Sequence, residues 1–220
     1  MSSDHSFLDG EHGVIPLFRL GINVFPGELL PLHIFEDKYQ RLLRYCLDED
    51  RDEEQRAAGV KPHLRPFGVV LSARNTAQWG CSVEVEAILE RHSDGRADIL
   101  TRGMRVFELL HVLPEEDFPR AHIRWAETID ESPQNLREVV RSEFAIFLRN
   151  IDVDKSLPPL DSISAFGIGA LIRLDVLERQ ELLNIASEKS RLVKLIDFLR
   201  FRNELVRRAG PNALKDMFSE

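Results

Sequence analysis

The feature that most restricts the fold of this chain is a proline inside a short apolar run. Residues 29–35 read LLPLHIF; they follow the turn-forming sequence FPGE at residues 25–28 and end at the charged sequence EDK at residues 36–38. Proline has no backbone N–H group and is therefore excluded from the central hydrogen-bonded positions of a sheet. Pro31 thus predicts an edge strand, a bulge or a surface crossing, and the apolar side chains around it can either fill the core or remain exposed.

The composition predicts a folded chain without a membrane span. The chain has 220 residues, of which 43% are hydrophobic and 30% charged, which suits one large domain or two small ones. The formal net charge of -8 argues against broad electrostatic attraction to nucleic acid or to anionic membranes. Neither an N-terminal signal core nor an apolar stretch near the ~18 residues of a membrane span occurs. Cys46 and Cys81 lack CxxC spacing, so no disulfide framework or zinc knuckle is expected, and the predicted location is the reducing cytoplasm.

Residues 14–125 predict a sheet with one packed helix. Near residue 36 the apolar spacing changes from that of a strand to that of an amphipathic helix. A hairpin turn is predicted at SDGR, residues 93–96, because Gly95 can adopt the positive φ angle of a tight turn. Glu84 and Glu86 are interpreted as a solvated strand face rather than as an acid–base pair. Strand patterns cover residues 14–18, 29–34, 67–71, 83–89, 105–113 and 121–125, and the charge run 48–54 is interpreted as a solvated connection.

The sequence beyond residue 130 predicts a bundle of helices. Ser132 is predicted to cap the first of them, with Pro133 in the first helical position. A helix at residues 163–174 follows, then a helix that starts at Asp175 or a neighbouring residue, and a cap at Ser187 for the last helix, which ends before residue 210. The predicted organisation is a flexible N-terminus 1–13, a β domain 14–130, a helical domain 131–210 and a tail 211–220.

Eight short segments together resemble the signature of one protein family. The chain resembles the N-terminal, substrate-binding domain of Lon protease, a module that also occurs as a free-standing protein, and the resemblance runs from about residue 14 to about residue 208. The segments that carry it read IPLF at 15–18, NVFPG at 23–27, LPLHIFE at 30–36, FGVV at 67–70, DGR at 94–96, GMRVF at 103–107, ALIRL at 170–174 and LERQELL at 177–183.

The resemblance implies both a fold and a role. The implied fold is α+β, a PUA-like β pseudo-barrel with one packed helix followed by a C-terminal α-helical bundle, and the implied partners are unfolded polypeptides or a partner protein. Two departures from the family pattern leave this fold expectation unchanged: Arg173 stands where proline is common, and the connection 48–66 is longer than usual. At a third position the chain has Val83-Glu84 in place of a Gly-Thr or Gly-Cys pair, or Gly80-Cys81 if three residues are inserted.

No catalytic machinery is expected. The chain has no Gly-Lys pair, which a phosphate-binding loop requires because its lysine and backbone N–H groups hold the phosphates. The Ser-Lys dyad of the family protease belongs to a separate domain, for which 220 residues leave no room. His33 is interpreted as a structural residue at a strand-to-helix junction. No metal and no cofactor are expected, because the histidines are spread singly along the chain, at His5, His12, His33, His63, His92, His111 and His122.

The function predicted from the sequence is polypeptide binding, or an adaptor role, without catalysis. An exposed apolar patch can bind an unfolded chain without reading its sequence. The candidate patch consists of Phe25, Leu29, Leu30, Pro31 and Leu32.

RNA binding is the first alternative function. It is suggested by the PUA-like resemblance and by residues 186–208, which hold seven basic and three acidic residues. A solvated helix face is the other interpretation of these charges, and because the whole chain is acidic, a nucleic-acid or membrane partner is not expected. A small-molecule enzyme is the second alternative, and no pair of residues supports it. The candidate RNA-binding residues are Arg200, Arg202, Arg207 and Arg208.

Overall fold

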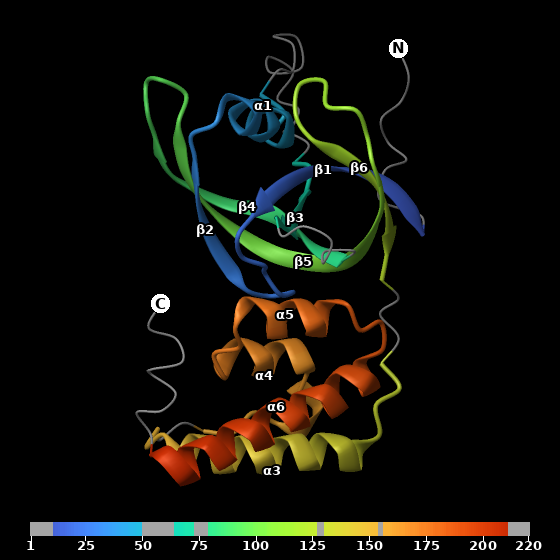
Figure 1. The fold of residues 1–220 in the computed structure, drawn as a ribbon. Helices are drawn as coiled ribbons and strands as arrows, with labels where there is room; N and C mark the ends of the chain where they lie inside the picture. Colours follow the sequence, from blue (N-terminus) through green and yellow to red (C-terminus); the bar gives the residue numbers. More distant parts are fainter. Residues whose placement is uncertain (1–10, 50–63, 73–78, 127–129, 154–155, 211–220) are drawn as a thin grey trace. The chain divides into compact units, whose positions relative to one another are not determined.

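The computed structural model describes residues 11–49, 64–72, 79–126, 130–153 and 156–210 of the chain. It divides into two compact units, Met1–Ala126 and Glu127–Glu220. The described part of the first unit holds the strands and one helix, and that of the second is helical (Figure 1). This order agrees with the predicted α+β organisation. Most of the predicted charged connection, at residues 50–63, lies outside the described residues.

The first unit is built on a mixed six-stranded sheet that curls into a barrel-like ring. The strand order is β2-β5-β4-β3-β1-β6, and β6 also pairs with β5. The β1–β3 pair is parallel, and the other described pairs are antiparallel. The strands are β1 (His12–Leu20), β2 (Leu29–Ile34), β3 (Phe67–Leu71), β4 (Trp79–Arg91), β5 (Ala97–Val112) and β6 (Arg120–Trp125).

The long strand β5 connects the two ends of this ring. Its first half, up to Arg102, pairs with β2, and its second half, from Phe107 onward, pairs with β6. Strand β2 therefore lies at the end of the strand order, with β5 as its neighbour. The prediction of an edge strand around Pro31 is confirmed, because Pro31 lies within β2. An edge position tolerates proline since its missing N–H group can face away from the ladder.

The turn before β2 is fixed against the middle of β5. Gly27 has a φ of 85° and follows a proline, as position i+2 of a type II turn requires, and the Glu28 N–H group donates to the Phe25 carbonyl oxygen at 3.1 Å. The Gly27 N–H group donates to the Gly103 carbonyl oxygen, and the Gly103 N–H group donates to the Glu28 carbonyl oxygen, each at 2.8 Å. The predicted turn at residues 25–28 is thus confirmed, and Gly103 is its partner in the sheet.

Helix α1 (Asp37–Cys46) covers one face of the sheet. Figure 1 shows it between the β4–β5 hairpin and the connection from β5 to β6. Because side chains alternate along β1, Phe18 and Leu17 belong to different apolar clusters. Phe18 lies in the cluster under this helix, where its ring stacks on the Tyr39 ring with 3.9 Å between the ring centroids. Leu17 lies in a second cluster. That second cluster, on the opposite face of the strands, contains Phe107 and Trp125. The strands therefore carry an apolar cluster on each face.

Both cysteines lie in the core of the first unit. Cys46 and Cys81 are free and buried, and burial raises the pKa of each thiol to about 12. Because the thiolate is the reactive form, we expect neither thiol to react with a thiol reagent such as DTNB in the folded protein at pH 8. Adding denaturant should release two equivalents of reactive thiol. Fast reaction of one equivalent before unfolding would contradict this burial.

The second unit consists of helices packed around an apolar core. Helices α3 and α6 lie side by side, and the shorter α4 and α5 pack near α6 (Figure 1). Within the described residues, no helix combines the length and the apolar character needed to cross a membrane. The elements are α3 (Gln134–Asn150), the 3-10 turn η2 (Leu160–Ser162), α4 (Ala165–Leu171), α5 (Val176–Leu183) and α6 (Glu188–Ala209).

Two of the predicted helix caps are confirmed and one is wrong. Ser187 accepts a hydrogen bond from the Ser190 N–H group, and Asp175 forms a capping box with Glu178. Ser132 does not cap α3. Pro133 occupies the cap position with a ψ of 145°, so the helix begins one residue later, because proline fixes φ and leaves ψ free to stay extended.

Helix α4 is shorter than the helix predicted at residues 163–174, because local features of the backbone end it on both sides. Ser164 caps the start of α4, and Arg173 adopts a φ of 50°, which turns the chain toward α5. Proline, whose φ is fixed near -65°, cannot adopt this angle, so arginine suits the position here. The fully buried Arg202 side chain on α6 donates to the carbonyl oxygens of Ile172 and Arg173 at 3.1 and 3.2 Å. These bonds satisfy carbonyl groups that the end of α4 leaves without helical partners.

Candidate functional site

The five residues predicted to bind polypeptide are divided between core and surface. Phe25 is 0% exposed, Leu30 is 8% exposed and Leu32 is 7% exposed, so the expectation of an apolar surface is wrong for these three. For Leu30 and Leu32 the reason is alternation along β2, because successive side chains of a strand point to opposite faces, whereas Phe25 lies in the turn before this strand. Leu29, which is 50% exposed, and Pro31 point outward.

The outward residues of β2 lie beside the outward residues of β5. Leu29 pairs with Arg102, Pro31 with Leu100 and His33 with Asp98. Met104, which is 41% exposed, continues the same row of β5 beyond Arg102. We call this surface the β2 face; its apolar members are Leu29, Pro31, Leu100 and Met104.

Polar pairs are fixed within and beside the apolar part of the β2 face. Arg102 donates to both carboxylate oxygens of Glu86, at 2.6 and 2.9 Å, and to the Gly27 carbonyl oxygen at 3.3 Å. The hydrogen bond from Arg102 lowers the pKa of Glu86. Glu86 therefore has a local partner, in agreement with its interpretation as part of a solvated strand face.

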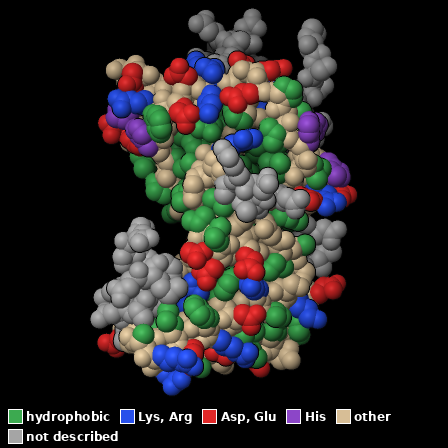
Figure 2. Space-filling model, viewed as in Figure 1, with side chains coloured by type: hydrophobic (Ala, Val, Ile, Leu, Met, Phe, Trp, Pro, Cys, Tyr) green, Lys and Arg blue, Asp and Glu red, His purple; other side chains and the backbone are tan. Residues whose placement is uncertain are grey.

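In the view of Figure 2, hydrophobic side chains make up much of the first unit's surface below a rim of charged ones.

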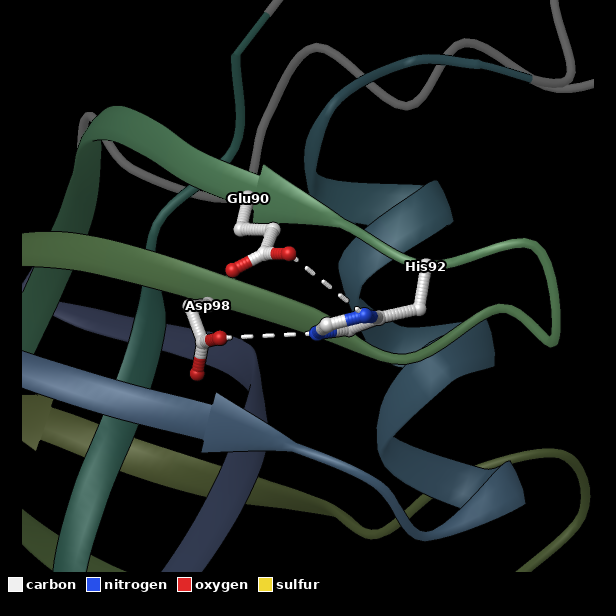
Figure 3. Close-up of side chains that lie close together, drawn as sticks. All are labelled: Glu90, His92 and Asp98. Atoms are coloured by element: carbon white, nitrogen blue, oxygen red, sulfur yellow. Dashed lines mark ion pairs between the residues drawn. The ribbon is translucent and has the colours of Figure 1, made fainter.

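Two of the histidines predicted to stand alone come together with two carboxylates where β2, β4 and β5 meet. His33 Nδ1 lies 2.7 Å from Asp98 Oδ1, and this hydrogen bond lowers the pKa of Asp98. His92 Nε2 lies 3.6 Å from Asp98 Oδ2, and its Nδ1 lies 3.8 Å from Glu90 Oε1. Figure 3 shows both carboxylates directed at the His92 ring. We call Glu90, His92, Asp98 and His33 the hairpin cluster.

Sequence spacing did not indicate the hairpin cluster, because its members come from three strands. A signal was present in part, since Glu90 and Asp98 lie on either side of the hairpin turn that Gly95 predicted. Pairing the two strands about that turn places them opposite each other, as the register shows. His33 joins only through the β2–β5 pairing, which links residues 65 positions apart in the chain.

A polar cleft of about 360 Å³ lies between α1 and the connection from β5 to β6. Its charges are partly compensated: Arg120 pairs with Glu116, and Arg41 donates to the Asp117 carbonyl oxygen at 2.9 Å. Charged walls of this kind do not suit an apolar peptide segment. The cleft is lined by Arg41, Arg44, Tyr45, Glu116, Asp117, Phe118 and Arg120.

The four arginines proposed for RNA binding do not form one surface. The prediction is wrong for Arg202, whose side chain is 0% exposed and pairs with Glu178. Arg200 is exposed and pairs with Glu143. Arg207 and Arg208 are exposed and share Glu204, and their hydrogen bonds lower the pKa of Glu204 to about 2.

Comparisons with known proteins point to one family. The family model described as the ATP-dependent protease La (LON) substrate-binding domain matches residues 14–200. Lon protease of Brucella suis is 22% identical over 205 residues, covering 87% of this chain and 24% of that protein. Lon protease of Rhizobium meliloti is 24% identical over 204 residues, which cover 86% of this chain and 24% of that protein. The chain thus spans about a quarter of the length of these curated relatives.

Solved structures show the same fold. A Lon N-terminal domain protein from Xanthomonas campestris superposes with a TM-score of 0.60 at 21% identity, covering 84% of this chain and 98% of that one. The N-terminal domain of a Mycobacterium avium complex Lon protease gives a TM-score of 0.57 at 14% identity, covering 85% of this chain and 98% of that one. The predicted architecture, a β barrel-like sheet with a packed helix followed by a helical bundle, is confirmed.

Proposed function

Because this chain belongs to the family of the Lon substrate-binding domain, we propose that it binds polypeptide segments through the β2 face and catalyses no reaction itself. The match covers the substrate-binding domain of Lon and does not extend to ATPase or protease domains. Binding unfolded chains, or a partner protein that offers an extended segment, is the role that this membership supports. The family model is described as part of an ATP-dependent protease, and the role proposed for this chain is polypeptide binding alone.

The observation that carries the proposal is the group of exposed apolar side chains on the β2 face, on the edge strand β2 and its neighbour β5. Leu29 is 50% exposed and Met104 is 41% exposed, and Pro31 lies next to Leu29 on the same outer row of β2. Apolar side chains that stay in water next to each other mark an interaction surface. Here they are held on regular strands, so little conformational entropy is lost when a partner binds.

The proposed surface should prefer unfolded over native polypeptides. Only an unfolded chain offers contiguous apolar side chains and free backbone. Such a chain loses conformational entropy when it binds, so we expect dissociation constants in the micromolar range, roughly -8 kcal/mol.

Leu29→Ser is expected to weaken the binding of an unfolded protein roughly tenfold, because loss of a central contact residue, unlike most other contacts of an interface, costs more than about 1 kcal/mol. The same variant should lose less than about 1 kcal/mol of folding stability, since half of its side chain already faces solvent. The measurement is fluorescence anisotropy of a labelled, reduced and carboxymethylated protein, together with urea unfolding of each variant.

Two neighbouring variants serve as controls. Leu30→Ser should lose several kcal/mol of stability, because Leu30 is buried and its replacement forfeits packing and leaves a hydroxyl group in the core. Leu177→Ser, at a leucine of α5 that is 66% exposed, should change neither binding nor stability. Equal weakening by Leu29→Ser and Leu177→Ser, or no binding of the unfolded protein below ~100 μM, would rule out the β2 face as the binding surface.

A further inference from the structure

We propose that the hairpin cluster is a binding site for a divalent transition metal, best fitted by Zn²⁺, with Glu90, His92 and Asp98 as ligands and His33 as the residue that positions Asp98. This inference does not depend on polypeptide binding. One ligand atom from each of the three proposed ligands lies within 4.8 Å of the other two (Figure 3).

The charges of the cluster call for a cation. Two carboxylates meet here, and among the described residues neither Glu90 nor Asp98 pairs with a lysine or arginine. The His92 ring faces a carboxylate oxygen from each of its two nitrogens. A divalent ion bound by one of these nitrogens and by the carboxylates would offset their two negative charges, while the other ring nitrogen keeps its N–H group as a donor.

The spacing of the cluster fits a small ion. Two ligand atoms that each lie about 2.1 Å from a tetrahedral Zn²⁺ are about 3.4 Å apart. His92 Nε2 lies 3.6 Å from Asp98 Oδ2, which exceeds a hydrogen bond and is close to the spacing of two zinc ligands. Glu90 Oε1 lies 3.8 Å from the other ring nitrogen, Nδ1, which cannot bind the same ion as Nε2. The Glu90 side chain is exposed, so the proposal requires it to rotate and bring an oxygen to the ion at Nε2.

The remaining contacts hold the ligands in place. His33 Nδ1 contacts Asp98 Oδ1 at 2.7 Å and leaves Oδ2 directed at His92. The His33 ring in turn lies 5.8 Å from the Phe35 ring, nearly parallel to it. The His92 backbone is fixed by the hairpin turn, donating to the Arg96 carbonyl oxygen at 2.9 Å and accepting from Gly95 at 3.1 Å. Such outer contacts orient ligands and increase metal affinity.

The ligand set favours zinc over the common hard cations. Imidazole nitrogen with carboxylate oxygen suits Zn²⁺, whereas Mg²⁺ and Ca²⁺ prefer oxygen ligands alone. Three protein ligands leave one tetrahedral position for water. We therefore expect one Zn²⁺ per chain at this site and no comparable affinity for Mg²⁺.

The test is a Zn²⁺ titration of the full chain in competition with a chromophoric zinc chelator. His92→Ala should weaken the site by more than the ~10–100-fold that loss of an outer contact produces, and His33→Ala should weaken it within that range. In two-dimensional amide NMR spectra, Zn²⁺ should shift resonances of residues 90–98 and of His33. Zn²⁺ should also raise the melting temperature of the unsubstituted protein and not that of His92→Ala.

His122→Ala is the matched control, because His122 pairs with His111 across β5 and β6 and offers the alternative two-histidine site. This variant should keep full affinity for the first Zn²⁺. Three results would overturn the proposal: a first site that survives His92→Ala, a first site that disappears in His122→Ala, or Zn²⁺ binding no tighter than that of Mg²⁺. In each case the hairpin cluster is a set of ion pairs without a metal function.

Discussion

Arg202→Met is expected to lower the free energy of unfolding of the helical unit by about 3–5 kcal/mol, the range for removal of one partner of a buried ion pair. The Arg202 side chain is 0% exposed, and its two terminal nitrogens contact both carboxylate oxygens of Glu178, at 3.0 and 2.5 Å. Methionine has a similar length but no donor. The substitution leaves Glu178, whose side chain is 18% exposed, without its cationic partner.

The same substitution also affects the connection from α4 to α5. Arg202 donates to the carbonyl oxygens of Ile172 and Arg173, and Glu178 also accepts from the Asp175 N–H group in the capping box of α5. One side chain of α6 thus fixes the end of one helix and the start of the next. Unpaired buried carbonyl groups add to the cost.

Urea unfolding followed by circular dichroism at 222 nm reports on these helices. Arg200→Met is the matched control on α6, and because Arg200 is 60% exposed, it should cost at most about 1 kcal/mol. Adding Glu178→Gln to Arg202→Met should recover part of the loss, since the glutamine removes the unpaired charge and can still form the capping box. Equal losses for Arg200→Met and Arg202→Met would contradict a buried ion pair at Arg202.

Gly103→Ala is expected to lower the stability of the β-rich unit by about 3 kcal/mol, the upper part of the range for overpacking. A Cβ atom at Gly103 would lie 2.1 Å from the Phe25 carbonyl oxygen and 2.9 Å from the Phe25 carbonyl carbon. The neighbour is backbone, so it cannot rotate away as a flexible side chain would. Moving it disturbs the two hydrogen bonds of 2.8 Å that join Gly103 to Gly27 and Glu28.

Tryptophan fluorescence reports on this unit, because Trp79 and Trp125 both belong to it. The control is Gly21→Ala, where a Cβ atom would meet nothing within 4 Å. That control should leave the urea midpoint of the fluorescence transition almost unchanged, whereas Gly103→Ala should lower it clearly. If the two variants unfold at the same urea concentration, the turn at residues 25–28 does not pack against β5 as described.

Features that depend on local backbone chemistry were predictable from the amino-acid sequence. Pro31 excluded a central strand position, Pro26 with Gly27 indicated the turn before it, and Ser187 marked the start of the last helix. Each of these residues restricts φ, supplies a cap or removes a donor whatever lies around it. The family signature was readable for the same reason, because much of it consists of turns and strand ends.

Tertiary structure alone decided which side chains face water and which meet across the sheet. Leu29 and Leu30 are chemically identical, and only the packing of β2 on β5 and over the core exposes the first and buries the second. Arg202 looks like any basic residue of a helix until the α4 end and Glu178 close around it. His33 and Asp98 are 65 residues apart and meet only through the strand register. Local spacing shows that neighbouring side chains of a strand alternate and where a hairpin turns, but which face is buried and which strands pair across long separations depend on partners distant in the chain.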